Sequence, residues 1–212
     1  MRALFGGSFN PVHNGHLILA RDVLEDFNLE EVIFVPANLQ PLKGELSIPP
    51  EVRLEALRAA TSLEPRFKVW DYEIKRGGVS YTYQTLEEFH RLYGERPLFV
   101  IGADSFNTLP RWKEPLKILQ LARLIVLSRP GFEPEVERVK KELGVDFTLK
   151  EFERGKVGGE LPQVSVYKGR QVEISSTEVR ERLKSGRPIT YLVPERAVEV
   201  LRRYGYGLQE DV

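Results

Sequence analysis

The sequence predicts an α/β fold, in which helices cover both faces of a mostly parallel sheet and so form three layers. Short apolar runs such as EVIFVP and RLIVLS, typical of buried strands, alternate with longer amphipathic stretches typical of helices. Glycine, proline or aspartate ends several of these runs. No repeat, low-complexity segment or shift in composition divides the chain, so we expect one domain over residues 1–212.

The first strand and helix are expected in the N-terminal stretch MRALFGGSFNPVHNGHLIL. Residues 2–5 would form the strand. Gly6 and Gly7 would break it and let the backbone turn tightly or approach a ligand closely, and residues 13–16 would open the helix. Further strands are expected at residues 31–36, 67–70, 98–103, 123–128 and 164–167, with an edge strand at 145–149. Further helices are expected at residues 50–62, 82–93, 114–121, 134–143, 177–184 and 194–203.

The turn between the first strand and helix is a candidate anion site. The first amides of a helix lack intrahelical partners, and the helix dipole favours negative charge there. His13 and His16 are three residues apart and share a face of this helix start. A second helix start, ISSTEVR, carries hydroxyls and Arg180. Two helix starts, two histidines and an arginine could surround a polyphosphate.

Each of these features also has a simpler interpretation. His13 and His16 could be capping or metal-binding residues, and a lone Gly-Gly is usually an ordinary turn. Ser175, Ser176 and Thr177 could form a plain helix cap. The sequence contains neither G-x-x-x-x-G-K-[ST] nor G-x-G-x-x-G, which argues against a P-loop kinase and a nicotinamide-dependent dehydrogenase.

Composition narrows the class of protein further. Lys and Arg total 31 and Asp and Glu total 31, and this balance argues against general nucleic-acid binding. Cysteine is absent, so disulfide and thiolate chemistry are excluded. No apolar run approaches the length of a membrane span, and a strand that starts at residue 1 leaves no room for a cleaved signal. We therefore expect a cytoplasmic protein that binds neither membranes nor nucleic acid.

Several runs together give the sequence a family resemblance. GGSFNPVHNGH and ISSTEVR resemble the nucleotidyltransferase superfamily marked by a His-x-Gly-His motif. Between them lie SYTYQTL, IGADSF, LPRWKE and RPG, in the order found in bacterial nicotinate-nucleotide adenylyltransferases. The resemblance implies a Rossmann-like nucleotidyltransferase fold. It also implies transfer of AMP from ATP to nicotinate mononucleotide, with release of nicotinate adenine dinucleotide and pyrophosphate in NAD biosynthesis.

The resemblance also implies roles for individual residues. It makes four residues catalytic: His13, His16, Lys43 and Arg180. It assigns ATP binding to Gly6, Gly7, Ser8, Phe9, His16, Gly102, Asp104, Ser175, Ser176, Thr177 and Arg180, with helices in residues 176–204 completing the site. It assigns the mononucleotide to Thr82, Asp104 and Trp112, although spacing alone would place Trp112 in the core and make Asp104 a helix cap.

The implied cofactor is Mg²⁺, which would arrive with ATP, and no protein metal site is assigned. Two departures from the family pattern affect the ATP loops: Leu42 stands where histidine is frequent, and Asn10 where aspartate is frequent. The expected partners are the two substrates, and the chain would be a monomer or a homodimer. Two alternatives stay open. One is a sister transferase acting on nicotinamide mononucleotide, phosphopantetheine or a cytidylyl-transfer substrate. The other is a nucleotide-binding regulator without activity.

Overall fold

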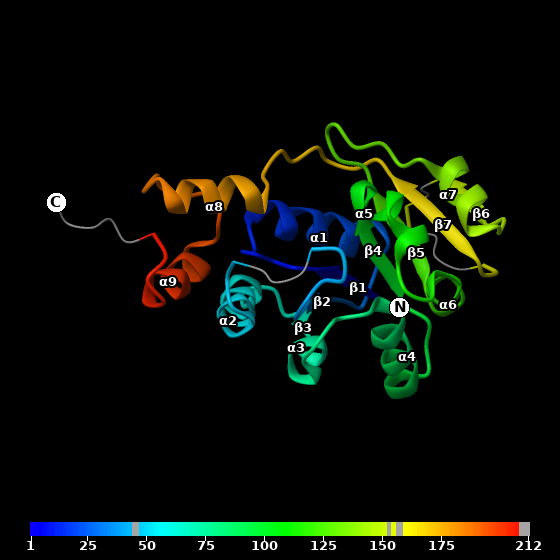
Figure 1. Cartoon of the computed structure of the whole chain (residues 1–212), viewed down its shortest axis with the longest axis horizontal. Coiled ribbons are helices and arrows are strands. Elements are labelled where there is room, and N and C mark those ends of the chain that lie inside the picture. Colours follow the sequence, from blue (N-terminus) through cyan, green and yellow to red (C-terminus); the bar gives the residue numbers. More distant parts are fainter. Residues whose placement is uncertain (44–46, 152–153, 156–158, 208–212) are drawn as a thin grey trace.

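The computed structural model describes residues 1–43, 47–151, 154–155 and 159–207. Within these residues, seven strands form one sheet in the order β3-β2-β1-β4-β5-β7-β6, and every neighbouring pair is parallel (Figure 1). The strands are β1 (Arg2–Gly7), β2 (Glu31–Pro36), β3 (Phe67–Val69), β4 (Leu98–Gly102), β5 (Arg123–Leu127), β6 (Thr148–Glu151) and β7 (Gln163–Tyr167).

Helices cover both faces of the sheet, which confirms the predicted α/β architecture. The helices are α1 (Asn14–Asp26), α2 (Pro50–Thr61), α3 (Tyr72–Arg76), α4 (Thr82–Tyr93), α5 (Ala103–Asn107), α6 (Pro115–Leu121), α7 (Val136–Leu143), α8 (Ser176–Lys184) and α9 (Glu195–Arg203), with a 3₁₀ turn η1 (Leu109–Arg111). Alternation along β1 creates two cores: Ala3 and Phe5 pack against α1, α2 and α9, whereas Leu4 packs on the side of α4, α5, α6 and α7.

The order of the strands fixes where a ligand can bind. From β1 the chain moves outward through β2 to β3, and then returns to place β4 on the other side of β1. The strand order therefore reverses between β1 and β4. Open parallel sheets bind ligands beyond the carboxyl ends of their strands at such a switch point. Gly7 and Gly102 end these two strands and so mark the expected cleft.

Most of the predicted elements lie within a few residues of their observed positions, but three details differ. Gly6 and Gly7 do not break the strand after Phe5: they form the last two residues of β1, and they pair with Val35 and Pro36 of β2. The edge strand β6 lies at Thr148–Glu151, later than the expected 145–149. The short helices α3 and α5 were not predicted, because five residues are too few to show a helical period. Part of the glycine-rich stretch at residues 155–162 lies outside the described residues.

Candidate active site

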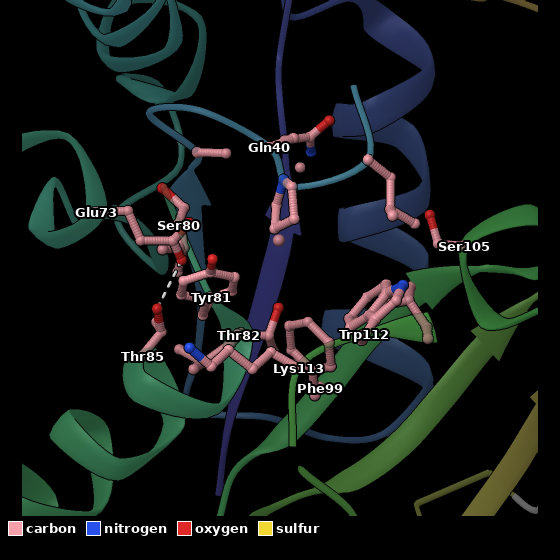
Figure 2. Close-up of a pocket in the computed structure, with 18 of the residues that line it drawn as sticks. Gln40, Glu73, Ser80, Tyr81, Thr82, Thr85, Phe99, Ser105, Trp112 and Lys113 are labelled. Atoms are coloured by element: carbon pink, nitrogen blue, oxygen red, sulfur yellow. Dashed lines mark hydrogen bonds between the residues drawn. The ribbon is translucent and has the colours of Figure 1, made fainter. Parts of the chain in front are cut away.

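A pocket of about 170 Å³ lies beyond the carboxyl ends of β1 and β4 (Figure 2). Loop 37–43, the segment 80–82, α4 and the region of η1 complete its wall. Six of the residues expected from the sequence to form the site line this pocket: Gly6, Gly7, Lys43, Thr82, Gly102 and Trp112. Residues that lie far apart in the chain therefore meet at the topological switch point.

Gly6 and Gly7, the last two residues of β1, line the pocket with backbone atoms because they carry no side chain. A Cβ on Gly6 would lie 3.1 Å from Cε2 of Phe99, and one on Gly7 would lie 3.3 Å from Cζ of Phe9. The positive φ expected of this turn falls on Phe9, at 46°, and not on the glycines. The glycines thus act through close approach to their surroundings rather than through turn geometry.

His13 and His16 form a reciprocal cap at the start of α1. The backbone N–H of His16 donates to Nδ1 of His13 at 3.3 Å, and the N–H of His13 donates to Nδ1 of His16 at 3.1 Å. Their rings stack with centroids 3.7 Å apart. Between them, a Cβ on Gly15 would lie 2.8 Å from Cε1 of His13. The glycine of the His-x-Gly-His motif is therefore required for the ring of His13 to fold back over the helix start.

This arrangement determines the protonation of both rings. Burial, and then the charge of Arg129, lower the pKa of His13 to about 4. Burial also lowers the pKa of His16 well below its usual value, with smaller effects from His13 and Arg129. Both rings are therefore neutral at pH 7. Since each Nδ1 accepts a backbone hydrogen bond, each ring carries its proton on Nε2, where it can donate to a ligand.

The second helix start lies directly against the first loop. Ser175 is the N-cap of α8, and its Oγ accepts from the N–H of Glu178 at 3.1 Å. Ser176 Oγ donates to the carbonyl of Pro11 at 2.9 Å, and Arg180 donates to the carbonyl of Asn10 at 2.8 Å. Arg180 also bonds Thr177 Oγ1 at 3.2 Å. The predicted cap is confirmed, and it brings Arg180 to the loop that precedes His13.

Arg53 of α2, which the sequence did not select, joins the loops around the site. Its side chain is fully buried and donates to the carbonyls of Ser8 and Ala37 at 2.7 Å, of Ile48 at 2.9 Å and of Asn38 at 3.2 Å. Burial lowers its pKa to about 10, so it stays charged at neutral pH. One guanidinium therefore fixes the segment after β1 relative to the loop that carries Lys43.

Asn10 also links the segment after β1 to the residues that precede α2. Its Oδ1 accepts from the backbone N–H of Ile48 at 3.0 Å, and its Nδ2 donates to Ser47 Oγ at 3.3 Å. An amide can do both, whereas an ionised carboxylate only accepts. The departure from aspartate at this position is thus compatible with an ordered loop.

Asp104 and Arg129 form an ion pair beside Gly102, which ends β4. Arg129 donates to Oδ2 of Asp104 at 3.5 Å, and its charge acts on both histidine rings. A Cβ on Gly102 would lie 2.6 Å from Oδ1 of Asp104, so the glycine admits this carboxylate beside the strand end. Asp104 itself does not line the pocket, whereas its neighbour Ser105 does. Arg129 belongs to the RPG run but was not selected as a site residue.

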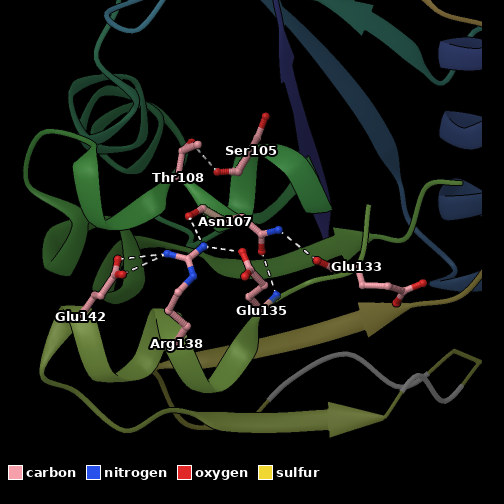
Figure 3. A network of polar contacts seen from close by, with 7 residues as sticks. All are labelled: Ser105, Asn107, Thr108, Glu133, Glu135, Arg138 and Glu142. Atoms are coloured by element: carbon pink, nitrogen blue, oxygen red, sulfur yellow. Dashed lines mark hydrogen bonds and ion pairs between the residues drawn. The ribbon is translucent and has the colours of Figure 1, made fainter. Parts of the chain in front are cut away.

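Hydrogen bonds fix the position of Trp112 in the wall of the pocket. Its Nε1 donates to Thr108 Oγ1 at 2.9 Å, and Thr108 Oγ1 donates to the carbonyl of Ser105 at 2.8 Å. Figure 3 shows how α7 holds this part of the wall: Arg138 donates to the carbonyl of Asn107 at 3.0 Å, and Asn107 bonds the backbone of residues 133 and 135. Trp112 is half-buried, so one indole face packs inward while the residue still lines the pocket.

Glu73 is a pocket carboxyl that the sequence did not select. Thr85 Oγ1 donates to its Oε2 at 2.7 Å (Figure 2). Burial raises the pKa of Glu73 to about 7, and bonds from Thr85 and Ser80 only partly oppose that rise. Ser80 Oγ also accepts from the N–H of Asn38 at 2.9 Å. Glu73 therefore connects α3, α4 and loop 37–43 on one side of the pocket.

The selected residues thus form two adjoining groups. One lines the pocket, and the other, with both histidines and Arg180, surrounds the loop at Asn10 and Pro11. Three residues with a clear structural role at the site were not predicted from the sequence. Gly15 and Arg129 lie inside the family motifs, whereas nothing in the sequence distinguishes Arg53 from any other arginine in a helix.

In the described part of the chain, no group of three or more His, Cys, Asp or Glu could hold a metal ion, and no helix is long and apolar enough to cross a membrane.

Known proteins match this chain along most of its length. The family model described as cytidylyltransferase-like matches residues 4–182. A protein of Aquifex aeolicus is 44% identical over 179 residues, which cover 84% of this chain and 100% of that protein. One of Clostridium tetani is 33% identical and covers 96% of this chain and 97% of its own length. Both carry the name "Probable nicotinate-nucleotide adenylyltransferase".

Solved structures share the fold at lower identity. The Plasmodium falciparum nicotinic acid mononucleotide adenylyltransferase complexed with NaAD superposes with a TM-score of 0.69 at 17% identity. The match covers 96% of this chain and 95% of that one. The same enzyme complexed with APC gives a TM-score of 0.65 over 96% and 94% of the two chains.

Proposed function

This chain belongs to the cytidylyltransferase-like family and, within it, to the nicotinate-nucleotide adenylyltransferases, and we propose that the cleft at β1 and β4 is its active site. The enzyme transfers AMP from ATP to nicotinate mononucleotide in NAD biosynthesis. A phosphate oxygen of the mononucleotide bonds to the α-phosphorus of ATP. The bond from that phosphorus to the bridging oxygen breaks, and pyrophosphate leaves with the bonding electrons.

The triphosphate of ATP would lie between the two helix starts. His13 and His16 are neutral rings that offer Nε2–H donors, and such donors stabilise charge that develops on phosphate oxygens. Arg180 would grip the departing pyrophosphate, because its planar fork matches two phosphate oxygens. Ser175, Ser176 and Thr177 would add hydroxyl and amide donors at the start of α8. The observation that carries this proposal is the reciprocal histidine cap facing a second helix start.

The nucleoside of ATP would contact the backbone at the end of β1, where Gly6 and Gly7 carry no side chain, and the following residues Ser8 and Phe9. At the neighbouring strand end, Gly102 and Asp104 would meet a ribose. Asp104 would accept hydroxyl hydrogen bonds, a role that its weak contact with Arg129 leaves open.

The acceptor would occupy the pocket of Figure 2, with Thr82 near the pyridine ring and Trp112 stacked on it. The braced indole supports this role, since a fixed ring costs little entropy on stacking. Lys43, which also lines the pocket, would reach the phosphates that react. The neighbouring Leu42 is exposed and also lines the pocket.

We also expect Mg²⁺ to arrive with ATP. The donor set fits an ion carried by phosphate oxygens, since Asp104 is the carboxylate at the strand end and it lies toward Arg129. When bound, the ion would neutralise phosphate charge and improve the leaving group. The single-domain organisation over residues 1–212, the cytoplasmic location and the monomer or homodimer state stay predictions.

The test is pyrophosphate release by purified protein with Mg-ATP and, in separate reactions, nicotinate mononucleotide, nicotinamide mononucleotide or phosphopantetheine. We expect release with nicotinate mononucleotide, a dinucleotide product of matching mass, and loss of release when EDTA is added. Turnover with another acceptor alone would overturn the assignment. ATP binding without turnover on any acceptor would favour a regulator.

A further inference from the structure

Lys113 places a second lysine on the pocket wall, apart from Lys43. It follows Trp112 and lines the pocket on the side of Tyr81 and Thr82 (Figure 2). Its Nζ lies 4.7 Å from the centroid of the Tyr81 ring. Among the described residues, no carboxylate lies within ion-pair distance of this ammonium, although 20 ion pairs join other groups over the same part of the chain. The pocket therefore contains a cation held only by an aromatic face.

The backbone around Lys113 is fixed in an uncommon form. Trp112 is anchored through Thr108, and the next residue after Lys113, Glu114, has a φ of 53° in the left-handed region. Side chains other than glycine, asparagine and aspartate rarely adopt this conformation, and where they do it often marks a functional site. The turn at Glu114 starts α6 and leaves Lys113 on the pocket wall.

The charge of the acceptor gives this lysine a partner. Nicotinate carries a ring carboxylate, whereas nicotinamide carries a neutral amide in its place. Glu73 lies in the wall of the same pocket and, when ionised, would oppose a second carboxylate. A cation on the wall is needed to offset that repulsion, and Lys43 lies on the loop assigned above to the phosphates. An ammonium pairs with a carboxylate more strongly than with an aromatic face.

We propose that Lys113 is a specificity-determining residue whose ammonium leaves the Tyr81 ring and pairs with the carboxylate of the pyridine ring, so that the pocket prefers the acid over the amide. This inference rests on the proposed placement of the acceptor beside Thr82 and Trp112. It adds a side-chain contribution to acid selection at that subsite.

The test compares KM and kcat for nicotinate and nicotinamide mononucleotides at saturating Mg-ATP. Lys113→Met should raise the KM for the acid about 10-fold, the usual scale for one charge-assisted hydrogen bond, and leave the KM for the amide and for ATP unchanged. Lys113→Arg should retain most of the preference, because it keeps the charge. The matched control is Lys117→Met. Lys117 lies 5.5 Å from the Tyr83 ring and pairs with Glu87, but it does not line the pocket, so its loss should change neither KM.

The variant Trp112→Ala distinguishes the proposed role of Lys113 from the proposed placement of the acceptor in this pocket. If this variant weakens the acid while Lys113→Met leaves the acid-to-amide ratio unchanged, the inference is overturned and the placement of the acceptor stands. If neither variant changes the KM for the acid, the acceptor does not bind in this pocket and both claims fail. Equal losses for acid and amide in Lys113→Met would also contradict the inference, because they would indicate a merely structural role.

Discussion

In the proposed site His16 has two roles, since its ring caps α1 and would also offer Nε2–H to a phosphate. We predict that His16→Ala lowers kcat by about 100-fold or more, as expected when a donor to the transition state is removed. The lost cap should cost only about 1 kcal/mol of stability, so the fold should persist. Pyrophosphate release and circular dichroism measure the two effects, and His90→Ala, an exposed histidine, is the control. Near-normal turnover would remove His16 from the mechanism.

The lowered pKa values of the histidines also predict a dependence of stability on pH. The pKa of His13 is about 4 in the folded protein, against about 6.5 in an unfolded chain. A depressed histidine pKa gives stability that is present above about pH 6.5 and is lost as pH falls toward 4. The raised pKa of Glu73 acts in the opposite direction between about pH 4.5 and 7.

A double variant isolates the histidine contribution. In His13→Gln, His16→Gln the free energy of unfolding should fall less between pH 6.5 and 4.5 than in the wild type, as measured by urea titration at each pH. Parallel curves for the two proteins would show that the histidines bind the same number of protons in both states.

At the scale of elements, Arg53 of α2 is the residue that holds two loops together. We predict that Arg53→Met costs about 3 kcal/mol or more, because four buried carbonyls lose their donor. It should also raise the KM for ATP, since Lys43 and Ser8 lose their common support. The matched control on the same helix is Arg58→Met. That side chain is 52% exposed and pairs with Asp71, so its loss should cost less than about 1 kcal/mol. Equal losses in urea unfolding would refute the argument.

The sequence predicted long elements well because their signals are local. Strands such as Glu31–Pro36 and helices such as Thr82–Tyr93 were confirmed at both ends, since period, caps and breakers agree there. Gly6 and Gly7 were expected to break the first strand but extend it, because glycine permits a turn without requiring one. The short helices α3 and α5 follow from packing at the strand ends and carry no periodic signal.

Site residues could be predicted from the sequence only where they lie within the family motifs. Lys43, Thr82 and Trp112 were named from the family pattern, and all three line the pocket. Arg53 was missed, because its burial depends on carbonyls supplied by Ser8 and by a loop before α2. Glu73 was missed for a similar reason, since its pKa is raised by burial in the folded protein, which no spacing in the sequence reveals.

For the whole molecule, the proposed ATP site depends on contacts between segments near the two ends of the chain. Figure 1 shows α8 and α9 beside α1 and α2, so the helices after β7 lie next to the first two helices of the chain. Arg180 then donates to the carbonyl of Asn10, 170 residues away in sequence. Only the folded chain therefore brings both helix starts together, where we propose that one triphosphate binds.

The last prediction tests that assembly through Arg180. Arg180→Ala should lower kcat/KM for ATP about 100-fold and leave the KM for nicotinate mononucleotide within about twofold, because the guanidinium faces the pyrophosphate and not the acceptor. Arg182→Ala on the same helix is the control, since that side chain pairs with Glu178 and caps the carbonyl of Pro188. Steady-state kinetics with each substrate varied in turn gives both values. If the two arginine variants lose ATP to the same extent, the effect arises from a loosened α8, and the site lacks a specific pyrophosphate contact at Arg180.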